Sequence, residues 1–498
     1  MKKLKTLIKY ILIIALGVLI GKYFFSDDVA TVPIPITMEY RYTAQSSKST
    51  HEAVESDFSG KIIEVKKGGS IQGAVNEALP GDLIRVFPGT YHENVYIDKD
   101  NISLQGVVIK GKWPTLEGEH KINDAFLYSG NGILIENFKI VNYKGNGIMG
   151  QAGNNFILRN NWIIDTGVYG IFPQYGKNGL IEHNVVSKIA DAAIYVGMCD
   201  NVDVLHNQVF DNVAGIEIEN SRHCLVENNY AHNNSGGLLA FITPGLPIKT
   251  TFDVIFRNNF VVNNNHENFA APGSIVSGVP EGTGILIMAA DDVIIENNII
   301  SGNDNAGILI VDLANGADAS EDPNSEPNPD RVVILDNLMY DNGNKPKGEL
   351  KALMMAQLSD KGPDIFAIGG GQGSTILDKN KYRSFGIDHY GPASLRDTKN
   401  ITTYMMDEPV APRSVSPEEL GELTYYGVCA GCHAFKTRLI GVPTETIQAM
   451  YANNPEGIVD YINKPKNLRD DYPEMPPQDY LSEEAKIAVA EYILTLKE

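Results

Sequence analysis

One asparagine returns at a nearly constant interval through the middle of the chain. Each time it follows a short apolar segment and a polar residue, as in the segment LIEHN that ends at Asn184. The successive spacings are 24, 23, 23, 22, 30, 39 and 39 residues, which indicates one structural unit that is repeated and later lengthened by loops. The repeated residues are Asn137, Asn161, Asn184, Asn207, Asn229, Asn259, Asn298 and Asn337.

The shorter spacings match one coil of a parallel β-helix. A single coil cannot bury its apolar side, so coils must stack and share one core. A second strand follows most of the asparagines, and its expected inward residues are Ile148, Ile171, Ile194, Ile216, Leu238, Ile285 and Ile308. An asparagine at a bend can bond to neighbouring backbone and tolerates unusual backbone angles. The repeat therefore predicts a structural ladder of stacked asparagines without a catalytic role.

The coils begin before the first repeated asparagine. The first coils are expected in segments 61–65, 81–86 and 88–93, and 70–78 is expected to be a short helix that caps the core. These segments resemble the entry of pectin-lyase-like right-handed parallel β-helix proteins, and the resemblance covers residues 60–385. It implies an all-β solenoid, which we place at 60–400. It implies no single function, since that fold carries lyases, hydrolases, epimerases and non-enzymes.

Three insertions interrupt successive coils, at Leu239–Thr251, His266–Gly284 and Asp312–Asp330. Successive coils should place them close together, and long loops on a rigid scaffold often carry function. The third insertion is acidic and is either a calcium-binding loop or a solvated one. Its carboxylates are Asp318, Glu321, Asp322, Glu326 and Asp330.

Alternation along the second strands predicts an apolar stripe on their outer face. If the isoleucines point inward, the outward residues are Met149, Phe172, Tyr195, Glu217, Leu239, Leu286 and Leu309. A large apolar patch marks a covered or binding surface. We expect the inserted loops or a C-terminal domain to cover this stripe, or its rings to stack on sugars.

A polysaccharide lyase or epimerase needs a group that neutralises the uronate and a base that takes the C5 proton. Register along the coils suggests Asp165, Asp211, Glu217, Arg222, His223 and His232 as candidates. They form no compact motif, so a solvated charged face is the competing interpretation.

The segment Cys429-Ala430-Gly431-Cys432-His433 has the C-x-x-C-H pattern of covalent c-type haem attachment. Two thiols at this spacing can bond to two vinyl groups of one haem, and the adjacent imidazole then lies beneath the iron. A thioredoxin-like pair would require a βαβ context, and a closed zinc site would require a second pair of ligands. Neither accompanies the motif.

The flanking sequence adds two helices and a candidate second ligand. Ser416 to Glu419 is a helix start with a capping box, and Ser482 opens a last helix that runs to Leu496. This order resembles the small monohaem cytochromes c over 416–498. The resemblance implies an all-α domain in which Cys429 and Cys432 bind one haem c, His433 is the proximal iron ligand and Met475 the distal one. Met450 is the competing methionine. The matching positions are Gly421, Tyr425, Cys429, Cys432, His433, Met475 and Tyr492.

Residues 1–27 are a targeting segment with four lysines before an apolar run at Ile11–Ile20. It is either a cleaved signal peptide or a retained N-terminal membrane anchor. Both place the protein in the periplasm or elsewhere outside the cytoplasm, and an anchor would hold it at the inner membrane. Polar segments 28–59 and 401–415 are predicted linkers.

The chain has 41 basic and 62 acidic residues, a net charge of −21, which excludes nucleic acid as a partner. Cys199 and Cys224 are nearly one coil apart and are either bridged or buried as free thiols. From all these features we expect an exported electron-transfer protein, with a redox partner protein and a β-helix that binds a partner or glycan. The alternative is a polysaccharide-active lyase or epimerase with an accessory cytochrome domain.

Overall fold

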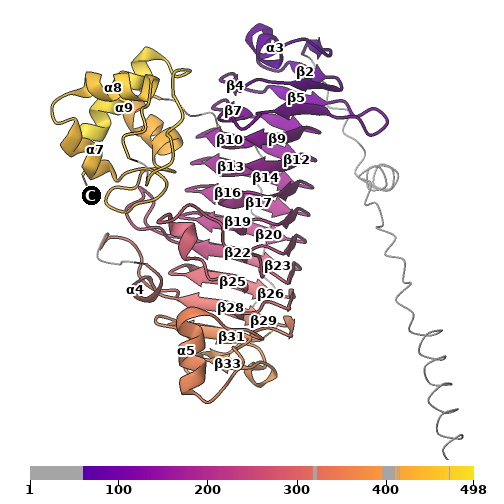
Figure 1. The fold of residues 1–498 in the computed structure, drawn as a ribbon, viewed down its shortest axis with the longest axis vertical. Helices are drawn as coiled ribbons and strands as arrows, with labels where there is room; N and C mark the ends of the chain where they lie inside the picture. The colour runs from indigo at the N-terminus through magenta and orange to yellow at the C-terminus, as the bar shows by residue number, and fades with distance from the viewer. Residues whose placement is uncertain are drawn as a thin grey trace, which may run out of the picture. The chain divides into compact units, whose positions relative to one another are not determined.

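The computed structural model describes residues 60–317, 322–394, 410–411, 413, 415–469 and 471–497. Ser59–Glu498 forms one compact unit, in which three parallel sheets make the faces of a β-helix (Figure 1). The targeting segment 1–27, the linker 28–59 and most of the linker 401–415 lie outside the described residues. Within the described ranges, no helix has the length and apolar character needed to cross a membrane.

Each coil contributes one strand to each sheet, and every strand pair within the sheets is parallel. Sheet A contains β1 (Ile62–Val65), β2 (Leu83–Val86), β5 (Ser103–Gly106), β8 (Leu134–Glu136), β11 (Ile157–Arg159), β14 (Lys177–Glu182), β17 (Asp200–Leu205), β20 (Arg222–Glu227), β23 (Phe252–Arg257), β26 (Asp291–Glu296), β29 (Val333–Leu335), β32 (Thr375–Ile376) and β34 (Gly391–Pro392). Sheet B contains β3 (Gly89–Tyr91), β6 (Pro114–Glu117), β9 (Lys139–Tyr143), β12 (Trp162–Thr166), β15 (Val185–Ser187), β18 (Gln208–Phe210), β21 (Tyr230–His232), β24 (Phe260–Val262), β27 (Ile299–Ser301) and β30 (Leu338–Tyr340). Sheet C contains β4 (Val95–Ile97), β7 (Phe126–Tyr128), β10 (Ile148–Gln151), β13 (Ile171–Gln174), β16 (Ala192–Gly197), β19 (Ala214–Glu219), β22 (Gly236–Phe241), β25 (Thr283–Met288), β28 (Ala306–Val311), β31 (Ile365–Ile368) and β33 (Ser384–Phe385).

The core fills the inside of the coils, as the repeat predicts. The expected inward residues of sheet C stand in register from Ile148 to Ile308, and all of them are fully buried. Matching rows of Ile, Val and Leu from sheets A and B complete the same cluster. Stacking in register shields each apolar row from water on both sides, so the coils are stable only together.

The predicted asparagine ladder forms at the bend from sheet A to sheet B. The backbone N–H of Asn184 donates to the side-chain oxygen of Asn207 at 2.9 Å, and this bond repeats from Asn161 to Asn337. The first predicted member is wrong. Asn137 is one residue too early, because Phe138 occupies the ladder position and its N–H donates to Asn161. Asn137 instead holds the left-handed backbone conformation just before the bend, at φ +66°.

A second asparagine ladder forms at the bend from sheet B to sheet C, and the sequence analysis did not identify it. The side-chain oxygen of each member accepts from the backbone N–H one coil earlier, as in Asn264 to Asn303 at 3.0 Å. Every member is buried, so each satisfies a backbone donor that water cannot reach. The members are Asn212, Asn234, Asn264, Asn303 and Asn342.

The helices of the β-helix region lie at its ends and in its insertions. Helix α3 (Ile71–Glu77) closes the N-terminal end of the core as predicted, with Ser70 as its N-cap. Helix α4 (Leu313–Gly316) begins the third insertion, α5 (Gly348–Ala356) follows β30, and two 3₁₀ turns span Ile275–Gly278 (η1) and Lys379–Lys381 (η3). Cys199 and Cys224 are both buried free thiols, which is the second of the two alternatives that the sequence left open.

The C-terminal segment contains α6 (Leu420–Thr424), a π-helical turn η5 (Tyr425–Cys429), α7 (Thr444–Met450), α8 (Pro455–Asn463) and α9 (Glu483–Thr495). Only half of the predicted capping box is present: Glu419 accepts bonds from the Ser416 backbone and hydroxyl, but α6 begins at Leu420, later than predicted, with Glu419 as its N-cap. Helices α6 and α9 approach closely at Gly421, where an added Cβ would lie 2.4 Å from the Ala488 carbonyl oxygen. This glycine therefore permits the contact between the two helices.

Candidate functional site

The outer face of sheet C carries the predicted apolar stripe, and the prediction that the stripe is covered is confirmed. Tyr195, Glu217 and Leu239 stand side by side on neighbouring strands in one outward row. The stripe residues are all buried although they point away from the core. Their cluster includes Ile275 and Val276 of the second insertion together with Ile440 and Tyr480 of the C-terminal segment. We call residues 410–497, as far as they are described, the C-terminal cover.

The three insertions converge at this face, as their order along the coils predicts. Asp322 of the third insertion accepts bonds from the Gly245 backbone and the Lys249 ammonium of the first. The Gly245 carbonyl in turn accepts from the Phe435 N–H of the cover at 2.9 Å. Because Asp322 is occupied by these groups, it is not available as a calcium ligand. The carboxylates of Asp318 and Glu321 lie outside the described residues.

Polar contacts attach the cover to the sheet. The Arg413 guanidinium donates to the Ala152 carbonyl at 2.9 Å and stacks over the Tyr175 ring, 4.5 Å from its centroid. The Gln174 amide donates to the Tyr426 carbonyl at 3.0 Å. Tyr480 packs on Tyr96 with ring centroids 4.7 Å apart. The cover is therefore anchored by a few hydrogen bonds and ring contacts around an apolar centre.

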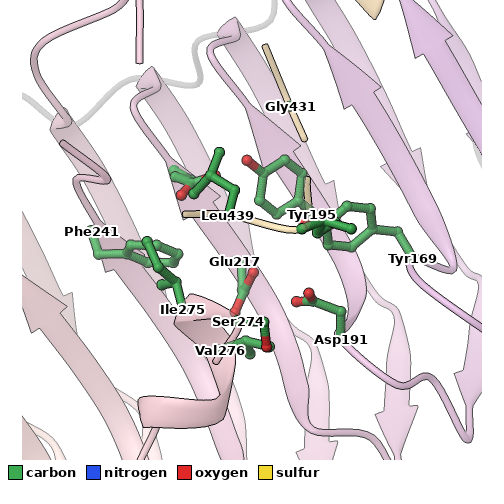
Figure 2. A pocket seen from close by; sticks show the side chains of 12 residues that line it. Tyr169, Asp191, Tyr195, Glu217, Phe241, Ser274, Ile275, Val276, Gly431 and Leu439 are labelled. Atoms are coloured by element: carbon green, nitrogen blue, oxygen red, sulfur yellow. The ribbon is translucent and has the colours of Figure 1, made fainter. Parts of the chain in front are cut away.

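A small pocket lies between the sheet, the second insertion and the cover (Figure 2). Its cavity volume is about 20 Å³, which is room for a single water molecule. Figure 2 shows the carboxyl groups of Asp191 and Glu217 directed toward the same space. The lining residues are Tyr169, Asp191, Tyr195, Glu217, Glu219, Phe241, Ser274, Ile275, Val276, Gly431, Leu439 and Ile440.

Three carboxyl groups of the pocket hold their protons more tightly than usual. Burial raises the pKa of Asp191 to about 8, and the charge of Glu219 raises it as well. Burial raises the pKa of Glu219 to about 7, although a hydrogen bond from the Thr243 hydroxyl lowers it. Burial and the charge of Asp191 raise the pKa of Glu217 far above its usual range. These groups cannot all be ionised together, so near neutral pH the cluster contains both proton donors and acceptors.

Three buried side-chain oxygens on this face have no hydrogen-bond partner among the described residues. They are Oε1 of Gln151, Oε1 of Gln174 and Oε1 of Glu217. An unpaired buried acceptor costs about 1–3 kcal/mol, so a native protein rarely keeps one without a reason. Of the three, only Glu217 lines the pocket, where a ligand with hydroxyl groups could supply the missing donor.

Aromatic rings form one wall of the pocket. Tyr169 and Tyr195 stack with centroids 4.5 Å apart and an interplanar angle of 25°. Phe172 meets Tyr195 edge to face at 4.7 Å. A stacked pair beside carboxyl groups is suited to a ligand with both apolar and polar faces.

The structure does not bring the six predicted lyase or epimerase candidates together. Glu217 alone reaches the pocket. Arg222 and His223 lie on sheet A. There the Arg222 guanidinium and the His223 ring nitrogen Nδ1 lie 3.1 and 2.7 Å from the carboxylate oxygens of Asp200. His232 is on the outer face of sheet B. The remaining two, Asp165 and Asp211, lie at the end of β12 and just after β18. Register along the coils was insufficient because the three sheets face different directions.

Asp191, Glu219 and Tyr169 were not among the residues predicted from the sequence. Glu219 follows Glu217 by two residues on β19, so the alternation that placed Glu217 outward places Glu219 there too. Asp191 and Tyr169 lie at bends, where alternation gives no direction. Only the folded coils show that these bends open onto the pocket.

The residues predicted to bind haem lie in the cover. The His433 ring nitrogen Nδ1 is 2.7 Å from the Val442 carbonyl oxygen, which fixes its proton on Nδ1 and leaves Nε2 free to bind a metal. Gly441 packs on this ring so closely that an added Cβ would lie 2.3 Å from Cε1. Met475 packs in the cover core with Cys429, whereas the competing Met450 is 54% exposed. These donors fit a haem with two thioether bonds and an imidazole ligand.

The cysteine loop presses directly on the sheet. An added Cβ at Gly431 would lie 2.6 Å from the Phe172 ring, and one at Gly427 would lie 3.1 Å from Ala152. Burial raises the pKa of both Cys429 and Cys432 to about 12, so both are protonated thiols. The described residues include no cluster of three or more His, Cys, Asp or Glu side chains that could hold a metal ion.

Comparison with known proteins supports the β-helix. The family model described as "Right handed beta helix region" matches residues 100–248, and no curated protein matches the chain. The A-module of mannuronan C-5 epimerase AlgE4 from Azotobacter vinelandii is 14% identical, covering 64% of this chain and 84% of its own, with a TM-score of 0.45. The alginate lyase from Paenibacillus sp. str. FPU-7 is 14% identical, covering 58% and 98%, with a TM-score of 0.41. The DFA-IIIase from Arthrobacter chlorophenolicus A6 is 14% identical, covering 67% and 97%, with a TM-score of 0.42.

The prediction of an electron-transfer protein is wrong on these findings. The three solved structures compared above are named as an epimerase, a lyase and DFA-IIIase, and none of these three is named as an electron carrier. The geometry gives a physical reason. The thiol loop of the supposed electron carrier lies against Phe172 and Gln174 of the solenoid, so this side is closed to a redox partner. The descriptions electron transfer and cytochrome c are therefore unsupported.

Proposed function

We propose that the protein is a carbohydrate-active enzyme whose catalytic groups are Asp191, Glu217 and Glu219. The observation that carries the proposal is their shared pocket, in which buried carboxyl groups with raised pKa values lie beside stacked tyrosine rings. Perturbed carboxyl groups in a concave site are the usual basis of acid–base catalysis. The unpaired oxygen of Glu217 supports a ligand that donates hydrogen bonds there.

The chemistry needs one protonated and one ionised carboxyl group. Glu217 is the protonated member, since burial and Asp191 both raise its pKa. It would donate its proton to the oxygen of the bond between two sugars as that bond breaks. Glu219, whose pKa is about 7, would accept the proton of the attacking water or hydroxyl. The donated and accepted protons balance, so the enzyme returns to its starting state after proton exchange within the cluster.

The pocket favours a neutral glycan over a uronate polymer. Removing the C5 proton of a uronate requires a cation near the carboxylate. The described residues that line the pocket include no Lys, Arg or His, and three carboxyl groups would repel a further one. Hydrolysis or transfer of a neutral sugar needs no such cation. We therefore infer glycosyl hydrolysis or transfer as the reaction class.

A sugar can enter only if the cover moves. The cavity of about 20 Å³ holds one water, whereas a sugar ring is many times larger. Gly431, Leu439 and Ile440 of the cover form one wall of the pocket. Movement of this wall exposes the carboxyl groups without unfolding the coils, which are held by their own ladders.

Haem c attachment to Cys429 and Cys432, with His433 and Met475 as iron ligands, stays a prediction. When bound, the group supplies an iron centre visible in the absorption spectrum. His433 would present Nε2, and Gly441 leaves room for its ring. Mass spectrometry of protein secreted with a working haem maturation system tests this prediction. Location outside the cytoplasm stays a prediction as well, and fractionation of cells tests it.

The full-length protein should be incubated with neutral and uronate polysaccharides and the products analysed by mass spectrometry. Hydrolysis adds one water per break, whereas lyase action adds none and leaves a double bond. We expect hydrolysis or transfer with a neutral polymer, and loss of roughly 10²–10⁴-fold in Glu217→Gln and Glu219→Gln. Asp203→Asn is the matched control, because Asp203 is a buried carboxyl on β17 outside the pocket with a pKa raised by burial to about 6. Equal losses in all three variants would contradict the proposal.

A further inference from the structure

The outer face of sheet B carries two rows of side chains along the stacked coils. The first row runs through Trp162, Val185, Gln208, Tyr230, Phe260, Ile299 and Leu338. The second runs through Ile164, Ser187, Phe210, His232, Val262, Ser301 and Tyr340. Large apolar side chains here remain in water, since Phe260 is 50% exposed and Tyr230 39%. Exposed apolar rows of this kind usually mark a binding surface, and the apolar stripe of sheet C is covered by contrast.

Four rings at the centre of this face form a connected group, which we call the ring cluster: Phe210, Tyr230, His232 and Phe260. His232 stacks on Phe210 at 5.1 Å and on Tyr230 at 4.1 Å, with interplanar angles of 7° and 26°. Phe260 stands at 81° to Tyr230, with centroids 6.3 Å apart. The stacked rings of Tyr230 and His232 therefore support the Phe260 ring, which is half exposed and nearly perpendicular to the Tyr230 ring.

The ring cluster is neutral and held in place. The Gln208 amide donates to Nε2 of His232 at 3.2 Å, which places the ring proton on Nδ1. Burial lowers the pKa of His232, although the Asp211 charge raises it, so the ring is uncharged near neutral pH. Rings fixed before binding lose little conformational entropy when a ligand arrives.

A polar groove borders the ring cluster at the bend from sheet A. It is lined by Glu227, Arg257, Asn258, Glu296, Asn297 and Asp336. Glu227 accepts from Arg257 at 3.0 Å and from Asn258 at 2.8 Å, and Asn297 donates to Asn258 at 2.6 Å. Carboxylate, amide and guanidinium groups next to flat rings can bond hydroxyl groups while the rings contact C–H faces.

We propose that this face binds a neutral polysaccharide chain that lies along the stack of coils. Neighbouring strands are about 4.8 Å apart, so the rows repeat on the scale of one sugar unit. The groove holds three carboxylates against one guanidinium, which disfavours a uronate chain. The proposal extends the proposed function, since such a face would hold the polymer whose bonds the pocket cleaves, but binding can be measured without catalysis.

A second copy of the chain is a poorer occupant. Each copy has a net charge of −21, so two copies repel one another. Polar residues such as Gln208, Ser187 and Ser301 interrupt the rows, whereas stable self-association requires a continuous apolar centre. A carbohydrate has both apolar C–H faces and hydroxyl groups, so it can contact the apolar and the polar residues of these rows.

The test is affinity electrophoresis of the full-length protein in gels that contain xyloglucan, glucomannan, arabinan, polygalacturonate or alginate. We expect at least one of the three neutral polymers to retard the protein and the two uronate polymers to have little effect. Phe260→Leu keeps an apolar side chain but removes the flat ring, and it should weaken binding roughly tenfold, as should Tyr230→Leu. Phe260→Tyr keeps the ring and should bind as the unchanged protein does.

Three results would overturn the proposal: no retardation by any neutral polymer, equal binding by the leucine variants, or a dimer in light scattering that Phe260→Leu dissociates. Glu217→Gln separates this proposal from the proposed function. If the pocket is catalytic, Glu217→Gln loses turnover but is still retarded by the polymer. If only the binding proposal is correct, the unchanged protein is retarded by the polymer without cleaving it. If only the catalytic proposal is correct, the unchanged protein cleaves a polymer, whereas Phe260→Leu leaves retardation unchanged.

Discussion

Sheets B and C are built from the same coils, yet their outer faces differ. Both carry rows of apolar and aromatic side chains in register. On sheet C these rows are buried beneath the second insertion and the cover. On sheet B the rings of Tyr230 and Phe260 remain in water. The same repeating backbone thus supports one enclosed face, suited to chemistry, and one open face, suited to binding.

The difference arises from where the chain accepts insertions. The first and third insertions leave the bend after sheet C, and the second leaves the bend before it. The bend from sheet A to sheet B stays short in every coil from Asn161 to Asn337, where the asparagine ladder is unbroken. Insertions therefore gather around sheet C.

The largest expected effect comes from placing a carboxylate on each face. Leu286→Asp should lower the free energy of unfolding by about 4 kcal/mol, because it opens a cavity and buries a charge. Phe260→Asp on the open face should cost about 0.5 kcal/mol, since water still reaches the new group. Urea unfolding measures both values. Small-angle scattering should also show the cover loosened in Leu286→Asp, and equal costs at the two sites would remove the distinction between the faces.

The next effect is a dependence of stability on pH that belongs to the covered face. Glu219 has a folded-state pKa of about 7, raised from 4.5 by burial. Between these values the unfolded chain has lost the proton that the folded chain keeps, so stability falls as pH rises from about 4.5 to about 7. Glu219→Gln should remove roughly 3 kcal/mol of this fall, measured as melting temperature against pH. A stability difference that stays constant with pH would contradict it.

The smallest effect tests how loosely the cover is held. Arg413→Ala removes three hydrogen bonds and a ring contact between the cover and sheet C, worth about 1–2 kcal/mol together. In protein made without haem maturation, maleimide should then label Cys429 and Cys432 roughly five- to tenfold faster. Lys139→Ala is the matched control, because Lys139 lies over the Trp162 ring at 4.4 Å on the open face. Similar labelling in both variants would mean that the cover does not open at Arg413.

The fold was readable from the sequence because its causes are local and periodic. Alternation along β13 and β19 fixed which side chains enter the core, and the repeated asparagine marked one bend of each coil. The error at Asn137 came from a coil in which Phe138 takes the ladder position. Alternation also gave Glu217 its outward direction and its place under a cover.

The rest of the site depends on contacts between distant segments. Asp191 joins Glu217 only because two bends open onto the same pocket, and Gly431 closes that pocket from more than 200 residues away in sequence. Periodicity carries no information about such encounters. The thiol motif at Cys429 is visible in the sequence, but its burial against Phe172 could not be inferred from spacing. The motif therefore suggested an accessible electron carrier that the packing does not support.

The asparagine ladders also bear on the order in which the coils form during synthesis. The backbone N–H of Asn184 donates to the side-chain oxygen of Asn207 in the following coil, and the N–H of Asn207 donates to Asn229 in the same way. A ribosome releases the earlier coil first, so every newly stacked coil ends with a buried donor that its successor must satisfy. The solenoid is therefore expected to fold by adding coils one at a time at its C-terminal end. A chain that ended between Asn207 and Asn229 would leave the Asn207 backbone N–H without its acceptor. An incomplete chain would therefore differ from a complete one at the last asparagine of its ladder.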